Sequence, residues 1–399
     1  MTGKRKRKLA MPDTLIIVAS VVLLVAILSW IIPSGTYDYQ EMNINGRIRN
    51  VAIDGTYHTI DKSEVTTTGF LGFFSVLYRG CVEAADVIFM ILCCCGTFGV
   101  VVKTGAFHAG IGTILKKLKG KEILLVPIIM MIFGLGGSVF GMASEFYGFY
   151  PLIVGLGVAL GYDAMFGFAI IAVGEFVGFM GATLNPYSVG IAQTISGVEL
   201  YSGTGYRAIC FVIFMAISII YVMVYGRKIK KNPGASVVFG EKNIHAFDRD
   251  ELNEYSFTLK DGLVLLDVLV VLVVLMLGLI KWGWDFPQLC GLFLLMSMIA
   301  AAICKWSPNK WCSEFIDSAK TAMWGCILTG IAKAITVVMQ DAQIMDTVIY
   351  GLSNVLKNAP HAVSAQVMLV VQTLINFFIP SATGQASATM PIMAQLADI

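Results

Sequence analysis

Two glutamates, Glu145 and Glu175, stand in long apolar stretches where an ionised side chain is costly. Glu145 is the only charged residue between positions 123 and 160, and Glu175 is the only one between 164 and 195. A carboxylate at bilayer depth is normally retained to handle a proton, a cation or a solute. We therefore predict that both line a polar path, the alternative being a protonated or hydrogen-bonded glutamate that only packs between helices.

Small and polar residues interrupt three of the apolar stretches, 123–160, 164–195 and 362–397. Backbone groups left unpaired in hydrocarbon cost several kcal/mol each, so irregular chain at that depth is expected only where it faces protein or a hydrated cavity. With the two glutamates, the candidate binding residues are Gly137, Ser138, Ser144, Glu145, Glu175, Thr183, Asn185, Pro186, Ser381, Thr383, Gly384 and Gln385.

The interruptions would present helix ends to a solute. Free N–H groups and the positive end of the helix dipole favour an anion, while carbonyls and hydroxyls suit Na⁺, which we expect near Ser138, Asn185 and Ser381. Pro186 alone would also be consistent with a kinked helix. Lys333, the only charge between 321 and 339, is a candidate partner for a glutamate or a solute carboxylate, unless it snorkels to the interface.

Composition places most of this chain in lipid. Hydrophobic residues make up 57% of the 399 positions and charged residues 14%, a balance that a water-soluble surface would not tolerate. The net charge of +2 gives no reason to expect a nucleic-acid partner. Most of the nine cysteines lie in apolar runs without metal-ligand spacing, so we interpret them as packing residues and predict no metal site and no cofactor other than a coupling Na⁺ or H⁺.

The apolar stretches predict an all-α polytopic membrane protein. About 20 apolar residues span the hydrocarbon core, and the stretches of roughly that length or longer are 14–32, 84–102, 164–195, 208–226, 262–280, 286–304 and 321–339. Two stretches, 123–160 and 362–397, are far too long for one crossing and must fold back as hairpins.

Basic residues orient the chain, because Lys and Arg accumulate on the cytoplasmic side. Basic blocks at 4–8, 103–121 and 227–231 all fall inside when the N-terminus is cytoplasmic, which places the chain in the inner (plasma) membrane. The block at 4–8 also resembles the start of a signal peptide, but a retained first helix is favoured by the length of the apolar run after it.

The predicted topology divides the chain into five parts. They are the basic N-terminus with the first helix (1–32), an extracytoplasmic and interfacial segment (33–83), a first repeat (84–226), a cytoplasmic linker (227–260) and a second repeat (261–399). The hairpin 123–160 enters from the inside and the hairpin 362–397 from the outside. We therefore predict inverted repeats with two re-entrant helical hairpins and a discontinuous helix at 164–195.

Several short motifs together resemble a known family. They are Met11-Pro12-Asp13-Thr14, residues 136–142, Gly161-Tyr162-Asp163, Asn185-Pro186, Lys230-Lys231-Asn232-Pro233, residues 381–386 and Thr389-Met390-Pro391. As a set, spread over nearly the whole chain, they are similar to the YfcC family of C4-dicarboxylate anaerobic carrier-like proteins within the ion transporter superfamily, some members of which are described as basic amino acid antiporters.

The resemblance implies a scaffold and a transport domain, a homodimer, and elevator-type alternating access. Carried over by position, residues 137–145, 183–186 and 381–386 would form the substrate and cation site. Proteins of this kind continue beyond the second hairpin into a further discontinuous helix. Because this chain stops at Ile399, we expect the C-terminal part of the second repeat to be missing.

These observations favour a secondary active transporter of a small carboxylate-bearing metabolite. Two glutamates and one lysine suit an amino acid, whose amine could meet a carboxylate, better than a C4-dicarboxylate, unless the glutamates carry Na⁺ or H⁺. A channel or membrane receptor is a further alternative. The chain has no G-x-x-x-x-G-K-[ST] element and no nucleophile-base constellation, so we predict no catalytic residues and no enzymatic activity.

Overall fold

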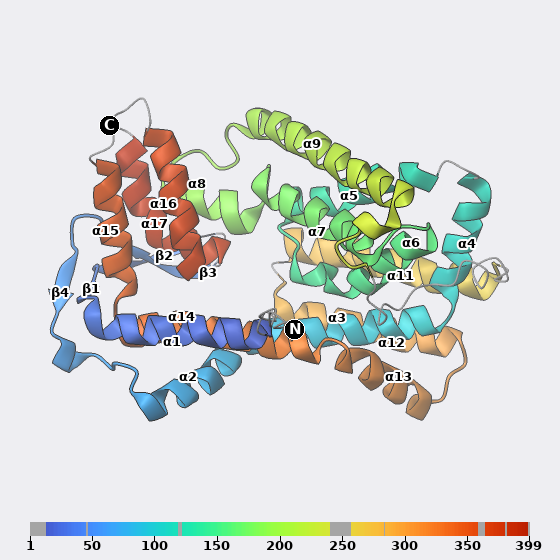
Figure 1. Cartoon of the computed structure of the whole chain (residues 1–399), viewed down its shortest axis with the longest axis horizontal. Helices are drawn as coiled ribbons and strands as arrows, with labels where there is room; N and C mark the ends of the chain where they lie inside the picture. Colours follow the sequence, from blue (N-terminus) through green and yellow to red (C-terminus); the bar gives the residue numbers. More distant parts are fainter. Residues whose placement is uncertain are drawn as a thin grey trace, which may run out of the picture. The chain divides into compact units, whose positions relative to one another are not determined.

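The computed structural model describes residues 13–44, 47–118, 122–239, 257–282, 284–357, 364–379 and 381–397. It is built mainly from α-helices, with four short strands between the first two helices (Figure 1). The basic block at 4–8 and half of the predicted linker 227–260 lie outside the described residues, and so do positions 362, 363 and 380 of the predicted hairpin 362–397.

Within the described residues, five helices are long and apolar enough to cross a membrane. They are α1 (Thr14–Ile31), α3 (Ala85–Lys103), α9 (Thr204–Lys231), α12 (Phe286–Ile303) and α14 (Met323–Asp341). The helix α11 (Leu259–Lys281) has 23 residues and occupies another predicted span. These helices confirm the predicted helical, multi-span architecture, whereas the inverted repeats and the re-entrant hairpins stay predictions.

Side-chain exposure on α9 fits a lipid environment. Large apolar residues are exposed along much of this helix, among them Ile209, Ile213, Ile217, Ile220 and Val224. Their spacing of three and four residues places them on one broad face of the helix. Such a row would be unfavourable in water and is expected against acyl chains.

The chain forms two compact units. The first comprises Met1–Gln40, Ala52–Ile88 and Trp324–Ile399, and the second comprises Glu41–Val51 and Phe89–Met323. Their limits differ from those of the predicted repeats, which describe topology rather than packing, so the repeat boundaries at 226 and 261 stay predictions.

In the first unit, α1 and α2 (Phe70–Glu83) pack against α14. A Cβ atom on Gly80 would lie 2.5 Å from the carbonyl oxygen of Gly330, so the two helices touch through their main chains. Arg79 on α2 forms an ion pair with Asp341 at the end of α14. The first unit therefore has a tight α2–α14 contact that only a residue without a side chain permits.

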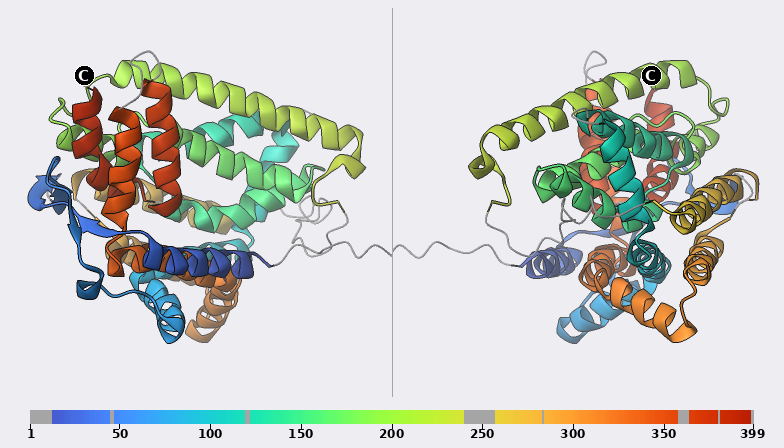
Figure 2. Two further views of the ribbon diagram at one scale, coloured as in Figure 1. Left: turned by 60° about the vertical axis from the view of Figure 1, so that its left-hand side comes forward. Right: turned by 90° about the vertical axis from the view of Figure 1, so that its right-hand side faces the viewer.

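The remaining helices of the first unit form a group with two strands. The helix α15 (Met345–Lys357) packs against both α16 (Ser364–Phe378) and α17 (Ala382–Ala397), the red and orange helices of Figure 2. The strands β1 (Ser34–Thr36) and β4 (His58–Ile60) pair antiparallel, with Ser34 opposite Ile60. The strands β2 (Tyr39–Ile44) and β3 (Arg47–Ala52) form a separate pair, most of which belongs to the second unit.

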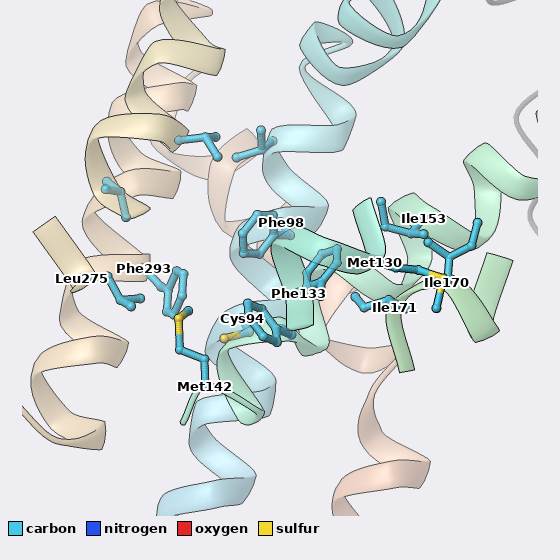
Figure 3. Packing of buried hydrophobic residues seen from close by; sticks show 14 of the residues in the cluster. Cys94, Phe98, Met130, Phe133, Met142, Ile153, Ile170, Ile171, Leu275 and Phe293 are labelled. Atoms are coloured by element: carbon cyan, nitrogen blue, oxygen red, sulfur yellow. The ribbon is translucent and has the colours of Figure 1, made fainter. Parts of the chain in front are cut away.

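The second unit is built around a core of aromatic and sulfur-containing side chains. Its remaining helices are α4 (Ala106–Leu118), α5 (Leu125–Leu135), α6 (Tyr150–Ala159), α7 (Ala164–Met180), α8 (Ile191–Ile195) and α13 (Pro308–Lys320). Figure 3 shows Phe98 of α3 close to Phe133 of α5, and Met142 beside Phe293 of α12. The centroids of the Phe98 and Phe293 rings are 5.9 Å apart, a distance typical of a packed aromatic pair.

Glycines bring α5 and α6 into main-chain contact with α7. A Cβ atom on Gly178 of α7 would lie 2.2 Å from the carbonyl oxygen of Gly134 on α5. At the other end of α7, a Cβ on Gly167 would lie 2.6 Å from the Cα of Val154 on α6. Helix backbones approach this closely only through small residues. The helix α7 therefore packs directly against both α5 and α6.

Candidate substrate and cation site

Two of the predicted interruptions lie in the second unit, each at the end of a helix. The helix α5 continues into a π-helical turn, Gly136–Phe140, which ends at Gly141 with a φ of +68°. The helix α7 ends at Met180, and the chain becomes helical again only in the π-helical turn Pro186–Gly190 that precedes α8. A positive φ is readily adopted by glycine, which explains why the first interruption begins at Gly141.

The two interruptions hydrogen-bond to each other. The carbonyl oxygen of Ser138 accepts from the amide of Thr183 at 2.9 Å and from that of Leu184 at 3.2 Å. The Ser138 hydroxyl donates to the carbonyl of Gly181 at 2.9 Å. A buried Ser138 thus satisfies main-chain groups that the end of α7 leaves unpaired.

Asn185 makes the second link between the interruptions. Its Nδ2 donates to the carbonyl oxygen of Gly137 at 3.0 Å, and its Oδ1 accepts from the amides of Tyr187 at 2.9 Å and Ser188 at 3.2 Å. The side chain is fully buried and caps the turn that begins at Pro186, whose own side chain lies outside the described set. The structure therefore brings Gly137, Ser138, Thr183 and Asn185 together.

We expect Asn185→Ala to destabilise the protein by about 2 kcal/mol or more, because it removes a helix cap and leaves the amides of Tyr187 and Ser188 without their acceptor. Thermal unfolding of the purified protein in detergent measures the loss. Asn232→Ala is the matched control, since Asn232 is exposed and its side chain makes no capping hydrogen bond. Equal unfolding temperatures for the two variants would contradict a structural role for Asn185.

Glu145 lies where the chain turns helical again after the first interruption. Its carboxylate is buried and accepts from the amide of Ala143 at 2.9 Å. The amides of Gly141, Met142 and Phe146 bond to carbonyls of the same segment. The expectation of free N–H groups for an anion is thus wrong for these four amides, because the segment pairs them itself. Ser144 begins the turn that follows, but its side chain lies outside the described set.

Glu175 lies on α7 with 1% of its surface exposed. The hydroxyl of Tyr150 donates to its Oε2 at 3.0 Å. The Tyr147 ring lies 6.1 Å from that of Tyr150. Neither tyrosine was predicted as a site residue, although two hydroxyl-bearing rings three residues apart, shortly after Glu145, are a recognisable pattern.

The third group of candidates lies in the first unit, at the start of α17. The Ser381 hydroxyl accepts from the amide of Gly384 at 3.2 Å, and Gln385 donates through Nε2 to the carbonyl oxygen of Gln372 at 2.9 Å. Thr389 is buried and accepts from Gln372 Nε2 at 3.2 Å. Thr383 and Gly384 are half-buried. Gln372 and Thr389 join α16 to α17 and were missed, because an isolated amide or hydroxyl in an apolar helix has no characteristic spacing.

Lys333 lies half-buried on α14 in the first unit and forms no ion pair among the residues that the structure describes. The same residues contain no group of three His, Cys, Asp or Glu side chains that could hold a metal ion. A cation at the candidate site would therefore rely on carbonyls, hydroxyls and single carboxylates.

Long apolar helices joined to polar interruptions define a multi-pass membrane protein. Residues 11–399 match the model of the family described as DcuC, C4-dicarboxylate anaerobic carrier. The chain belongs to this family of transporters, and the predicted family resemblance is confirmed.

Two relatives cover nearly all of the chain. One is YfcC of Escherichia coli (strain K12), provisionally described as a basic amino acid antiporter, which is 31% identical over 100% of this chain and 85% of its own length. The other, from Haemophilus influenzae, is 28% identical over 99% of this chain and 86% of its own length. Among solved structures, MtrF of Neisseria gonorrhoeae, described with antimetabolite efflux pumps, gives a TM-score of 0.46 at 16% identity, covering 98% of this chain and 81% of MtrF. A similarity at that level supports no conclusion about this chain.

Proposed function

We propose that this transporter is a secondary active carrier that exchanges basic amino acids. The observation that carries the proposal is the pair of buried carboxylates, Glu145 and Glu175, for which the described residues supply no basic partner. A buried carboxylate is stable only when it is protonated or compensated by a cation. The α-amine or side-chain cation of an amino acid would supply that charge, as would Na⁺ or H⁺.

In this proposal the solute carboxylate binds near Ser381, Thr383, Gly384 and Gln385, where α17 begins with a neutral serine cap. A helix start of this kind favours an anion. In the second unit, we propose that Gly137, Ser138, Ser144, Thr183, Asn185 and Pro186 bind the solute or its coupling ion. A coupling Na⁺ near Ser138, Asn185 or Ser381 and the charge partner Lys333 belong to the same proposal.

The wider setting of the proposal follows the family. We propose a homodimer in the inner membrane with a cytoplasmic N-terminus, and alternating access of the elevator type. The second candidate function is a C4-dicarboxylate carrier, which the family description favours. A dianion beside two carboxylates would need Na⁺ or H⁺ to offset the repulsion.

Counterflow of radiolabelled solutes into proteoliposomes tests the proposal. With unlabelled arginine inside, we expect labelled arginine and ornithine to accumulate transiently above equilibrium, whereas succinate does not. Counterflow of succinate alone would overturn the amino-acid proposal in favour of the second candidate. A flux that solute on the opposite side does not stimulate would instead indicate a channel.

A further inference from the structure

The strand segment of the first unit holds the turn between α14 and α15. The hydroxyl of Ser34 donates to the carbonyl oxygen of Ala342 at 2.7 Å, and the amide of Gly35 donates to that of Gln343 at 2.9 Å. Ser34 and Ala342 are buried. The turn itself is unusual, because Gln343 has a φ of +47°, a conformation that is uncommon outside glycine. Strand β1 thus supplies hydrogen-bond donors for two carbonyl oxygens of this turn.

The carboxylate of Asp346, in the first turn of α15, accepts hydrogen bonds from three residues of the same segment. Its carboxylate accepts from the amide of Tyr37 at 3.1 Å, from the Thr36 hydroxyl at 3.2 Å and from the Tyr39 hydroxyl at 2.8 Å. Only 7% of Asp346 is exposed. Burial, reinforced by the charge of Asp346, raises the pKa of Tyr39, so its phenol stays a proton donor across the physiological range.

An aromatic contact lies one turn further along α15. The rings of Tyr57 and Tyr350 stack with centroids 4.1 Å apart, and the Tyr57 hydroxyl lies 2.9 Å from that of Thr347. A Cβ on Gly35 would lie 2.4 Å from the Tyr57 hydroxyl, so a larger residue there would displace the Tyr57 ring. Two contacts therefore hold the first half of α15 to residues 34–40 and 52–60.

This contact continues into the helices that carry the second group of site residues. The buried residue Ile349 of α15 belongs to the same hydrophobic cluster as Tyr37, Val371 and Ile375, and as Met393 of α17. Close-packed clusters of this kind transmit displacement because they leave few voids. A change in the position of α15 must therefore shift α16 and α17, and with them the chain at Ser381 and Gln385.

We propose that Asp346 is a positioning residue for the start of α17, acting through α15, and that the first-unit residues 34–40 and 52–60 take part in solute transport by fixing its position. The inference rests on the proposed function insofar as it assigns solute binding to residues 381–385. A carboxylate with at least three donors has a defined position, because each donor constrains it in a different direction. In Asp346→Asn, the amide would direct an NH₂ group at hydrogen-bond donors. The substitution therefore breaks the hydrogen-bond network while keeping the size of the side chain.

Hydrogen–deuterium exchange of the full-length protein tests the positioning role. In Asp346→Asn we expect exchange of the amides at 382–385 to rise about tenfold, the loss expected from one hydrogen bond to a charged group. Exchange in α5 and α7 should not change. Tyr39→Phe removes one donor and keeps the carboxylate, so it gives a smaller rise and serves if Asp346→Asn does not fold. Asp317→Asn, an exposed residue paired with Lys320, is the control.

Transport kinetics supply the second readout. We expect the KM of the exchanged solute to rise about tenfold in Asp346→Asn, with the maximal rate per folded molecule nearly unchanged. If hydrogen–deuterium exchange at 382–385 is unchanged in both Asp346→Asn and Tyr39→Phe, the inference is wrong, even if the transporter carries basic amino acids. If the protein carries only succinate but hydrogen–deuterium exchange at 382–385 still increases in the variants, the positioning role is supported and the amino-acid proposal is wrong.

Discussion

Glu175→Gln is expected to lower solute exchange about tenfold or more, while the protein still folds and inserts. Glutamine keeps the size of the side chain and can still accept from the Tyr150 hydroxyl, which lies 3.0 Å away. What it loses is the negative charge that an amine, Na⁺ or H⁺ would neutralise. A hydrogen bond to a charged group contributes about 1.5–3 kcal/mol, which corresponds to a factor of about 10 to 100 in binding.

Glu145→Gln should give a loss of the same order, because Glu145 is also buried and forms no ion pair among the described residues. Initial rates are measured over a range of pH and Na⁺ concentration, since loss of a coupling site changes ion dependence as well as rate. Glu199→Gln, at an exposed turn of the same unit, is the control. Wild-type rates and ion dependence in both variants would show that the two glutamates serve only packing.

Gly178→Ala is the second substitution with a large expected effect. The added methyl would lie 2.2 Å from the carbonyl oxygen of Gly134, and a main-chain atom cannot yield as a flexible side chain can. The helices α5 and α7 would have to separate, which costs about 1–3 kcal/mol for an overpacked site. We expect a clear fall in unfolding temperature in detergent and a smaller fraction of folded protein in the membrane.

Gly291→Ala on α12 is the matched control, because a methyl there would meet no atom within 4 Å. Alanine also has the higher helix propensity, so this variant should be as stable as the wild type or slightly more stable. If Gly178→Ala unfolds at the same temperature as Gly291→Ala, the close approach of α5 and α7 is not a feature of the folded protein.

The sequence predicted the long helices because lipid imposes a simple rule on length and hydropathy. It also indicated the interruptions that follow α5 and α7, since Gly141 and Asn185-Pro186 disfavour continued helix locally. The short amphipathic helices were not predicted. No span was assigned to residues 340–361, which contain α15, because its polar residues obscure the helical pattern.

The contacts made by the candidate residues could not be predicted. The bonds from Ser138 to Gly181 and from Asn185 to Gly137 join residues more than forty positions apart, and no local pattern encodes that pairing. The role of Asp346 is hidden for the same reason, since its donors lie some 310 residues earlier in the chain. Tertiary structure decides which of several plausible polar residues meet.

The glycine contacts along α7 have a consequence for how a carrier of this kind changes shape. Interlocked backbones leave α5, α6 and α7 no room to slide, since sliding would drive carbonyl oxygens at Gly134 and near Gly167 into neighbouring chain. In the alternating-access cycle proposed above, the three helices would therefore move as one rigid body. Bending would be confined to the short non-helical stretches 141–143 and 181–185, the second of which includes the proposed binding residues Thr183 and Asn185.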